Sequence, residues 1–158
     1  MEIDGRELRN ALGQFATGVC LITAIAEDGE ALALTANSFS SVSLDPPLVL
    51  WSLQNDSDVF DVYSQAQHFA INVLAAPQQD HSNQYARKGE HQLDESHYRL
   101  GEAGAPLIND ALISFECDLH ATHEGGDHLI IVGRVTNLIS NPGSDPLLFY
   151  AGGYRELQ

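Results

Sequence analysis

Basic side chains are scarce in this sequence. Its 158 residues contain 7 lysines and arginines against 22 aspartates and glutamates, which gives a formal net charge of −15. Such a charge argues against binding to a nucleic-acid backbone or to an anionic membrane surface. The single lysine, Lys88, follows Arg87, and no other two basic residues are adjacent. An anionic ligand is therefore expected at this pair, although a solvated helix end would explain the pair equally well.

Cysteine is also rare, and long apolar runs are absent. Cys20 and Cys117 each lie in an apolar alternating stretch without CxxC or metal-site spacing, which predicts two buried free thiols. No run approaches the roughly 20 apolar residues of a membrane helix, and the acidic start lacks the basic region and apolar core of a signal peptide. We expect one domain over residues 1–158, able to fold without disulfides or a structural metal, in the cytoplasm.

Six segments have the composition or the period-two alternation of β-strands. They cover residues 18–26, 31–35, 48–54, 68–75, 112–122 and 128–139. Helices are expected after Asp4, after Ser57 and over residues 78–88, and residues 89–109 are expected to form a long surface loop. This order predicts a mainly β fold, a closed or partly closed antiparallel barrel with peripheral helices.

The last two predicted strands differ in how their faces are covered. Along residues 112–122, apolar residues alternate with Ser114, Glu116, Asp118 and His120, which predicts a half-buried strand with these four side chains on the outer face. Residues 128–139 are apolar on both faces near their start, which hints at a partner subunit. The aromatic, glycine-rich tail at residues 146–154 is expected to dock against the rest of the chain.

Residues 35–49 form a polar connection between two predicted strands. Uncharged hydrogen-bonding side chains dominate its first half, at Thr35, Asn37, Ser38, Ser40, Ser41 and Ser43. Such groups suit the recognition of carbonyls, ring nitrogens and sugar hydroxyls. A solvated serine-rich loop is the plain alternative. Phe39, Val42 and Leu44 interrupt the polar positions and are expected to pin part of the loop to the core.

Histidine is frequent, but its spacing predicts no metal site. His120 and His123 are three residues apart on a strand and so point to opposite faces, whereas His91 and His97 lie in a predicted loop. GxSxG, GxGxxG and GxxxxGK[ST] motifs are all absent, which argues against a serine hydrolase, a Rossmann cradle and a P-loop. His128 follows a tight glycine turn at the mouth of a strand, where a histidine can orient a ligand.

Five segments follow one another through nearly the whole chain. They are FATGVCLITA at 15–24, LTANSFSSVSLDPPLV at 34–49, FAINVL at 69–74, GDHLIIVGRV at 126–135 and PLLFYAGGY at 146–154. In this order they resemble the short-chain flavin reductases, FMN-binding split-barrel proteins that often serve two-component flavin monooxygenases. The resemblance implies a six-stranded antiparallel split β-barrel with peripheral helices, assembled as a homodimer with flavin near the subunit interface.

The resemblance also implies roles for particular residues. Contacts to the flavin ring and ribityl chain fall on Thr35, Ala36, Asn37 and Ser38, with Ser41, Val42 and Ser43 next to them. Contacts to the flavin phosphate fall on Ser52, Ser57, Arg87 and Lys88. His128 corresponds to the residue on the nicotinamide side, and Tyr154 lies in the tail segment that borders the flavin.

The function implied is an NAD(P)H:flavin oxidoreductase that supplies reduced flavin to a partner monooxygenase. Hydride passes from C4 of the nicotinamide to N5 of the flavin, so the cofactors make and break the bonds themselves. A flavin-binding carrier or sensor without catalysis, and a split-barrel flavin oxidase acting on a small substrate, remain alternatives. FMN and FAD are both open, as are NADH and NADPH, although scarce basic residues for a 2′-phosphate favour NADH.

Overall fold

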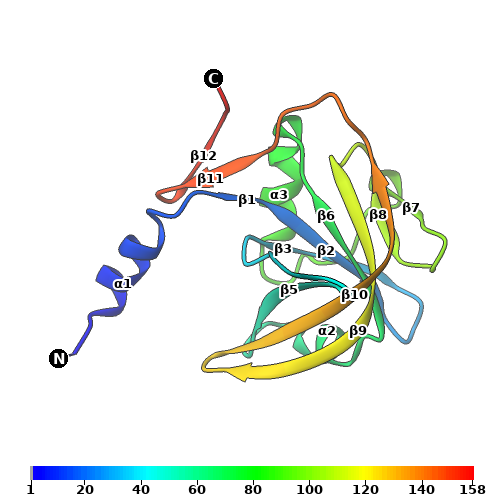
Figure 1. The fold of residues 1–158 in the computed structure, drawn as a ribbon, viewed down its shortest axis with the longest axis horizontal. Coiled ribbons are helices and arrows are strands. Elements are labelled where there is room, and N and C mark those ends of the chain that lie inside the picture. The colour runs from blue at the N-terminus through cyan, green and yellow to red at the C-terminus, as the bar shows by residue number, and fades with distance from the viewer. Residues whose placement is uncertain (1) are drawn as a thin grey trace.

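A computed structural model describes residues 2–158 of the chain, and its main feature is one strongly twisted antiparallel sheet (Figure 1). The sheet has seven strands in the order β3-β2-β6-β9-β10-β5-β4. Their bounds are β2 Cys20–Ile25, β3 Ala31–Ala36, β4 Ser40–Leu44, β5 Pro47–Gln54, β6 His68–Val73, β9 Ile113–Gly125 and β10 His128–Ser140. The mainly β prediction is confirmed, and all six predicted strands are present.

The seventh strand, β4, corrects the prediction of a continuous loop over residues 35–49. The polar segment instead ends β3, crosses residues 37–39, forms β4 and turns through the cis Asp45–Pro46 peptide into β5. Ser40 and Ser41 pair with Leu50 and Val49. Hydroxyl side chains suit an exposed edge strand, which is why composition alone made this segment look like a loop.

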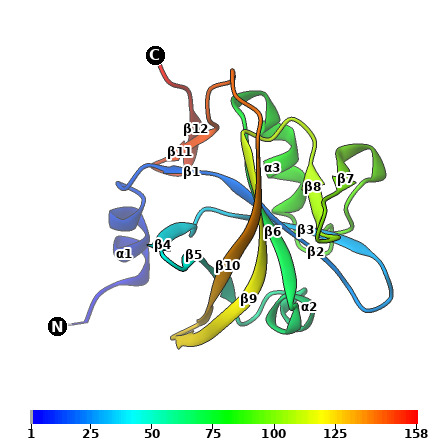
Figure 2. The same cartoon turned by 45° about the vertical axis from the view of Figure 1, so that its right-hand side comes forward.

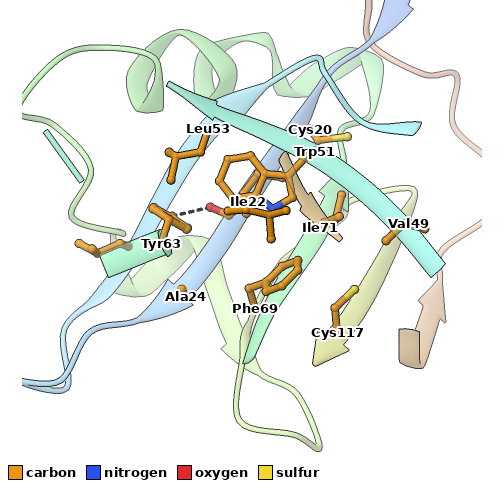
Figure 3. Close-up of a cluster of buried hydrophobic side chains, with 12 residues drawn as sticks. Cys20, Ile22, Ala24, Val49, Trp51, Leu53, Tyr63, Phe69, Ile71 and Cys117 are labelled. Atoms are coloured by element: carbon orange, nitrogen blue, oxygen red, sulfur yellow. Dashed lines mark hydrogen bonds between the residues drawn. The ribbon is translucent and has the colours of Figure 1, made fainter. Parts of the chain in front are cut away.

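The interior of the barrel is filled by side chains from six strands. Its core comprises Cys20, Ile22, Ala24, Leu32, Val49, Trp51, Leu53, Tyr63, Phe69, Ile71, Cys117 and Ile131. Figure 3 shows the Trp51 indole beside Ile22, with Tyr63 donating to the Ile22 carbonyl at 2.7 Å. Inward side chains from successive strands around one centre are the arrangement of a small barrel.

Both cysteines are buried and free, as the sequence predicted. Burial raises the pKa of the Cys20 thiol to about 12, and burial together with Asp118 and Glu116 raises the pKa of Cys117 to about 12. These thiols stay protonated and act as apolar core groups.

The remaining elements lie around the barrel. They are α1 Gly5–Leu12, β1 Thr17–Gly18, α2 Phe60–Gln65, a 3₁₀ turn Ala76–Gln78, α3 Gln79–Tyr85, a 3₁₀ turn Glu95–His97, β7 Tyr98–Leu100, β8 Pro106–Ile108, β11 Leu148–Tyr150 and β12 Gly153–Arg155. The tail docks as predicted, because β11 pairs with both β1 and β12. None of the helices in the described part of the chain has the length and apolar character to span a membrane.

Residues 89–109 are not wholly a loop, and this changes the outer face of β9. The β7–β8 hairpin lies against that face, so Ser114 and Glu116 are buried instead of exposed. The Glu116 carboxylate accepts hydrogen bonds from the Ala103 amide at 3.1 Å and from Asn137 Nδ2 at 3.0 Å. Asp118 and His120, farther along the strand, keep more solvent contact, as predicted.

The helix α1 begins after Asp4, whose carboxylate accepts from the Glu7 amide at 3.3 Å as a helix cap should. No residue of α1 is buried. Figures 1 and 2 show the helix standing apart from the sheet. Its junction with the tail includes a hydrogen bond from the Ala151 amide to the Gly13 carbonyl at 2.9 Å.

Candidate functional site

A cavity of about 250 Å³ lies where the end of β3, the helix α3 and the C-terminal hairpin meet. Its lining residues are Val19, Thr35, Ala36, Asn37, Ser82, Ala86, Phe149 and Tyr154. Four of these, at positions 35, 36, 37 and 154, are among the cofactor-binding residues predicted from the sequence. Three segments that are far apart in the chain thus meet at one cavity.

The β3 end offers backbone groups to this cavity. Residues 91–93 cover the outer edge of β3 as far as Ala33, whose amide donates to the His91 carbonyl at 2.9 Å. Backbone groups of every second residue point to the same edge of a strand, so the amide and carbonyl of Thr35 point to the same outer edge as those of Ala33. Residues 91–93 do not extend far enough to cover them. The Thr35 hydroxyl donates to the Ser82 carbonyl at 2.7 Å, which ties the strand end to α3.

The C-terminal hairpin closes the opposite side of the cavity. The Tyr154 hydroxyl donates to Asn83 Oδ1 at 3.0 Å and lies 2.7 Å from the Ser82 hydroxyl. The Tyr154 and Phe149 rings meet edge to face, with centroids 5.3 Å apart. This network holds the tail on α3 and gives the cavity an aromatic wall.

A second cavity of about 800 Å³ adjoins the first and shares Asn37 and Phe149 with it. It extends under the end of α1 and past Ser38 to Gly152. The two cavities form one cleft with Asn37 at its middle. The Asn37 side chain makes no hydrogen bond within residues 2–158, so its amide is available to a ligand.

Ser38 is engaged with β5. Its hydroxyl accepts from the Ser52 amide at 2.9 Å and lies 3.3 Å from the Ser52 carbonyl. The pairing between β4 and β5 ends at Ser40 and Leu50. Ser38 therefore bonds to the part of the β5 edge that β4 does not cover. Ser38 and Ser52, both predicted to contact the cofactor, therefore hold the connection between β3 and β4 in place.

Three of the predicted phosphate residues, Ser57, Arg87 and Lys88, lie on two turns, whereas Ser52 lies on β5. Ser57 precedes α2, which begins at Phe60 rather than directly after Ser57, and its hydroxyl accepts from the Val59 amide at 3.3 Å. Arg87 and Lys88 follow α3, which ends at Tyr85, three residues earlier than predicted. Ala86, one residue before Arg87, lines the cavity, so the second turn begins at the cavity's rim.

Of the predicted site residues, only Thr35, Ala36, Asn37, Ser38 and Tyr154 line the cleft. Besides Ser52, Ser57, Arg87 and Lys88, four others lie outside it. Ser41, Val42 and Ser43 lie on β4, with a bulge in its pairing between Ser41 and Ser43, and the Val42 side chain is half exposed. His128 opens β10 opposite Gln54, and its Nδ1 lies 2.6 Å from an oxygen of Asp127. Its Nε2 is left for another partner.

The sequence pointed to Tyr154 on the hairpin but missed Ser82, Ala86 and Phe149, which also line the cavity. Ser82 and Ala86 stand in no motif that signals a ligand, whereas Phe149 lies in the PLLFYAGGY segment. Among residues 2–158, no group of three or more His, Cys, Asp or Glu side chains is placed to hold a metal ion.

The cleft suits a planar ligand with polar edges. Val19, Ala36 and Phe149 offer apolar surface, while Asn37 and the Thr35 backbone offer neutral hydrogen-bonding groups. An isoalloxazine ring has this character, with apolar faces and carbonyl and nitrogen groups at one edge. The residues present therefore fit a flavin ring.

Known proteins that are similar to this chain are flavin reductases. A model of the family described as "Flavin reductase like domain" matches residues 12–158. The chain is 44% identical over 151 residues to "FMN reductase (NADH) SmoA" of Agrobacterium fabrum, covering 96% of this chain and 85% of that protein. It is 42% identical over 149 residues to the reductase component of a flavin-dependent trigonelline monooxygenase of Acinetobacter baylyi, covering 94% of this chain and 48% of that protein.

Solved structures agree with this result. The NADH:FAD oxidoreductase SgcE6 of Streptomyces globisporus superposes with a TM-score of 0.91 at 36% identity, covering 100% of this chain and 97% of that chain, and it has also been solved with NAD and FAD fragments. The chain spans about half the length, 48%, of two of the curated relatives that it matches.

Proposed function

The chain belongs to the flavin reductase-like domain family, and from this premise we propose that it is an NAD(P)H:flavin oxidoreductase. The observation that carries the proposal is the cleft in which Thr35, Ala36, Asn37 and Tyr154 converge. Two relatives named as an FMN reductase and an NADH:FAD oxidoreductase support it, since they align with most of this chain.

The chain's own residues serve to bind and orient. A bound flavin supplies the hydride-accepting chemistry, and the protein supplies binding and electrostatics. The Thr35 backbone and the Asn37 amide would hold the polar edge of a bound ring, where neutral donors stabilise charge that builds up during hydride transfer. Phe149 and Val19 would pack on its apolar part. Ser38 holds the loop in its binding conformation through Ser52.

His128 is proposed to orient the nicotinamide. Its Nδ1 is directed to Asp127, which leaves Nε2 to meet the ligand. Since His128 lies on β10 outside the cleft walls, the nicotinamide is expected to approach from the β5–β10 side.

Reductase activity is the experiment that tests the function. Purified protein with added FMN or FAD is expected to oxidise NADH, with NADPH used less well because few basic residues are present for its 2′-phosphate. The measurement is the steady-state loss of absorbance at 340 nm for the four flavin and nucleotide pairs. Flavin binding without nucleotide oxidation in every pair would instead favour a carrier or sensor.

A monooxygenase is the partner proposed for the reduced flavin. The trigonelline relative carries this role in its name, and it aligns with nearly all of this chain.

Cys20 and Cys117 remain free thiols, which agrees with a reducing compartment, and we place the protein in the cytoplasm.

A homodimer is proposed from the apolar surface of α1 and β4. Exposed apolar side chains occur on or next to these two elements in sequence, at Ile3, Leu8, Leu12, Phe15, Val42 and Leu44, and Leu44 is 97% exposed. Apolar surface of this kind marks an interaction site, and a second copy is the commonest partner of a soluble protein. The α1 helix would then lie on the partner subunit, which accounts for its lack of buried residues.

Charging this surface is expected to split the dimer. Replacing Leu8 and Leu12 with glutamate should raise the dimer dissociation constant at least about 100-fold, since each leucine contributes about 1.5–3 kcal/mol when buried. Light scattering after gel filtration measures the mass. Arg6→Glu, on the opposite side of α1 from Leu8 and outside the lining of the cleft, is the control and should remain dimeric. A wild-type protein that is monomeric at micromolar concentration would contradict the proposal.

A further inference from the structure

Asp58 joins its own turn to the turn at Gly89, which lies 31 residues later in the chain. One oxygen of its carboxylate, Oδ2, accepts a hydrogen bond from the Gly89 amide at 2.6 Å. The other, Oδ1, lies 3.0 Å from Nε2 of His91. Both oxygens of the carboxylate thus contact the turn that follows α3.

His91 links the same carboxylate to β3. Its side chain is only 6% exposed, and its Nδ1 lies 3.0 Å from the Ala33 carbonyl. The ring therefore lies between two oxygen atoms, one on β3 and one on Asp58, and it connects the turn that carries Asp58 to the strand.

The residues joined in this way are neighbours of three proposed flavin contacts. Asp58 directly follows Ser57, and Gly89 directly follows Lys88. Ala33 lies two residues before Thr35 on β3. The Asp58–His91 pair therefore fixes the spacing between the Ser57 turn, the Arg87–Lys88 turn and the strand end that lines the cavity.

The charges at this point agree with an anionic ligand. Both oxygens of the Asp58 carboxylate face hydrogen-bonding groups, the Gly89 amide and the His91 ring. Arg87 has Glu90 at 3.8 Å as an exposed and loose partner, and no carboxylate within residues 2–158 pairs with Lys88. Two cations thus remain available at the turn that Asp58 holds.

We propose that Asp58 is a positioning residue for the phosphate end of the flavin, holding the turn that carries Ser57 against the turn that carries Lys88. The inference rests on the proposed function, and it adds that the Asp58–His91 pair makes the site prefer phosphorylated flavins. Riboflavin, which has the same ring and ribityl chain without the phosphate, does not depend on this pair.

Flavin affinity measured with FMN and with riboflavin tests the proposal. Asp58→Ala should raise the Kd of FMN about tenfold, because the turn that carries the cations is released, and should leave the Kd of riboflavin within about twofold. Asp58→Asn, which keeps an acceptor for the Gly89 amide, should fall between the wild type and alanine. Asp56→Ala removes the same charge from the same turn without these bonds, and it is the matched control.

A second measurement separates positioning from general stability. In a Lys88→Ala background, Asp58→Ala should weaken FMN binding much less, because the cation that it positions is already absent. Equal loss of FMN and riboflavin affinity, or unchanged FMN affinity, in Asp58→Ala would overturn the inference. So would a wild type that binds riboflavin as tightly as FMN, although reductase activity would then stand. A protein that binds neither flavin and oxidises no NADH would instead overturn the proposed function itself.

Discussion

Replacing Ala86 with tryptophan is expected to weaken flavin binding strongly without unfolding the protein. Ala86 is exposed at the end of α3 and lines the cavity of about 250 Å³, so an indole at this position occupies the space of the ligand rather than that of the core. Affinity for FMN should fall by about two orders of magnitude, which corresponds to about 2.7 kcal/mol. Titration of flavin fluorescence measures the Kd, and NADH oxidation should fall with it.

The control for this replacement is Ala86→Ser at the same position. Serine leaves the cavity open, so FMN affinity and turnover should remain close to those of the wild type. Thermal unfolding of the two variants should agree within a few degrees, since an exposed position tolerates either residue. If Ala86→Trp binds FMN with wild-type affinity, the flavin does not occupy this cavity, and the Thr35–Tyr154 wall has another role.

The barrel could be predicted from the sequence because its strands carry strong local signals. Residues 112–122 alternate between apolar and polar, and 128–139 are apolar on both faces, so β9 and β10 were recognisable without any contact information. The edge strand β4 was missed because its hydroxyl side chains are equally typical of a loop. The burial of Glu116 was missed because it depends on the β7–β8 hairpin, a contact between segments that the alternation of β9 cannot reveal.

Part of the candidate site could be expected from the sequence, because some of its residues are neighbours in the chain. Thr35, Ala36 and Asn37 belong to one contiguous motif, and the structure brings them to one cavity with Tyr154. Ser82 and Ala86 carry no signal of their own, because their place in the cavity follows from the docking of α3 beside β3. The Asp58–His91 pair is also invisible in sequence, since its two members lie on separate turns and meet only in the fold.

Truncating Trp51 to alanine is expected to destabilise the protein strongly, because it removes a large side chain from the centre of the core. The indole is 1% exposed and meets the Tyr63 ring edge to face, with centroids 5.6 Å apart. Tyr63 is itself fixed by its bond to the Ile22 carbonyl, so the surrounding groups cannot collapse freely into the space. The free energy of unfolding should fall by about 3–5 kcal/mol. Urea or thermal unfolding, at one fixed protein concentration, measures it.

Trp51→Phe is the informative comparison, because the indole N–H has no hydrogen-bond partner among the described residues. A buried donor without a partner carries a desolvation cost, and phenylalanine removes that donor while keeping an aromatic ring against Tyr63. The loss of volume and the relief of this cost oppose each other, so phenylalanine should cost about 1–2 kcal/mol, well below alanine. Equal costs for the two variants would mean that the ring contact with Tyr63 contributes little. The stability of the core around Trp51 would then depend mainly on the pairing of the surrounding strands.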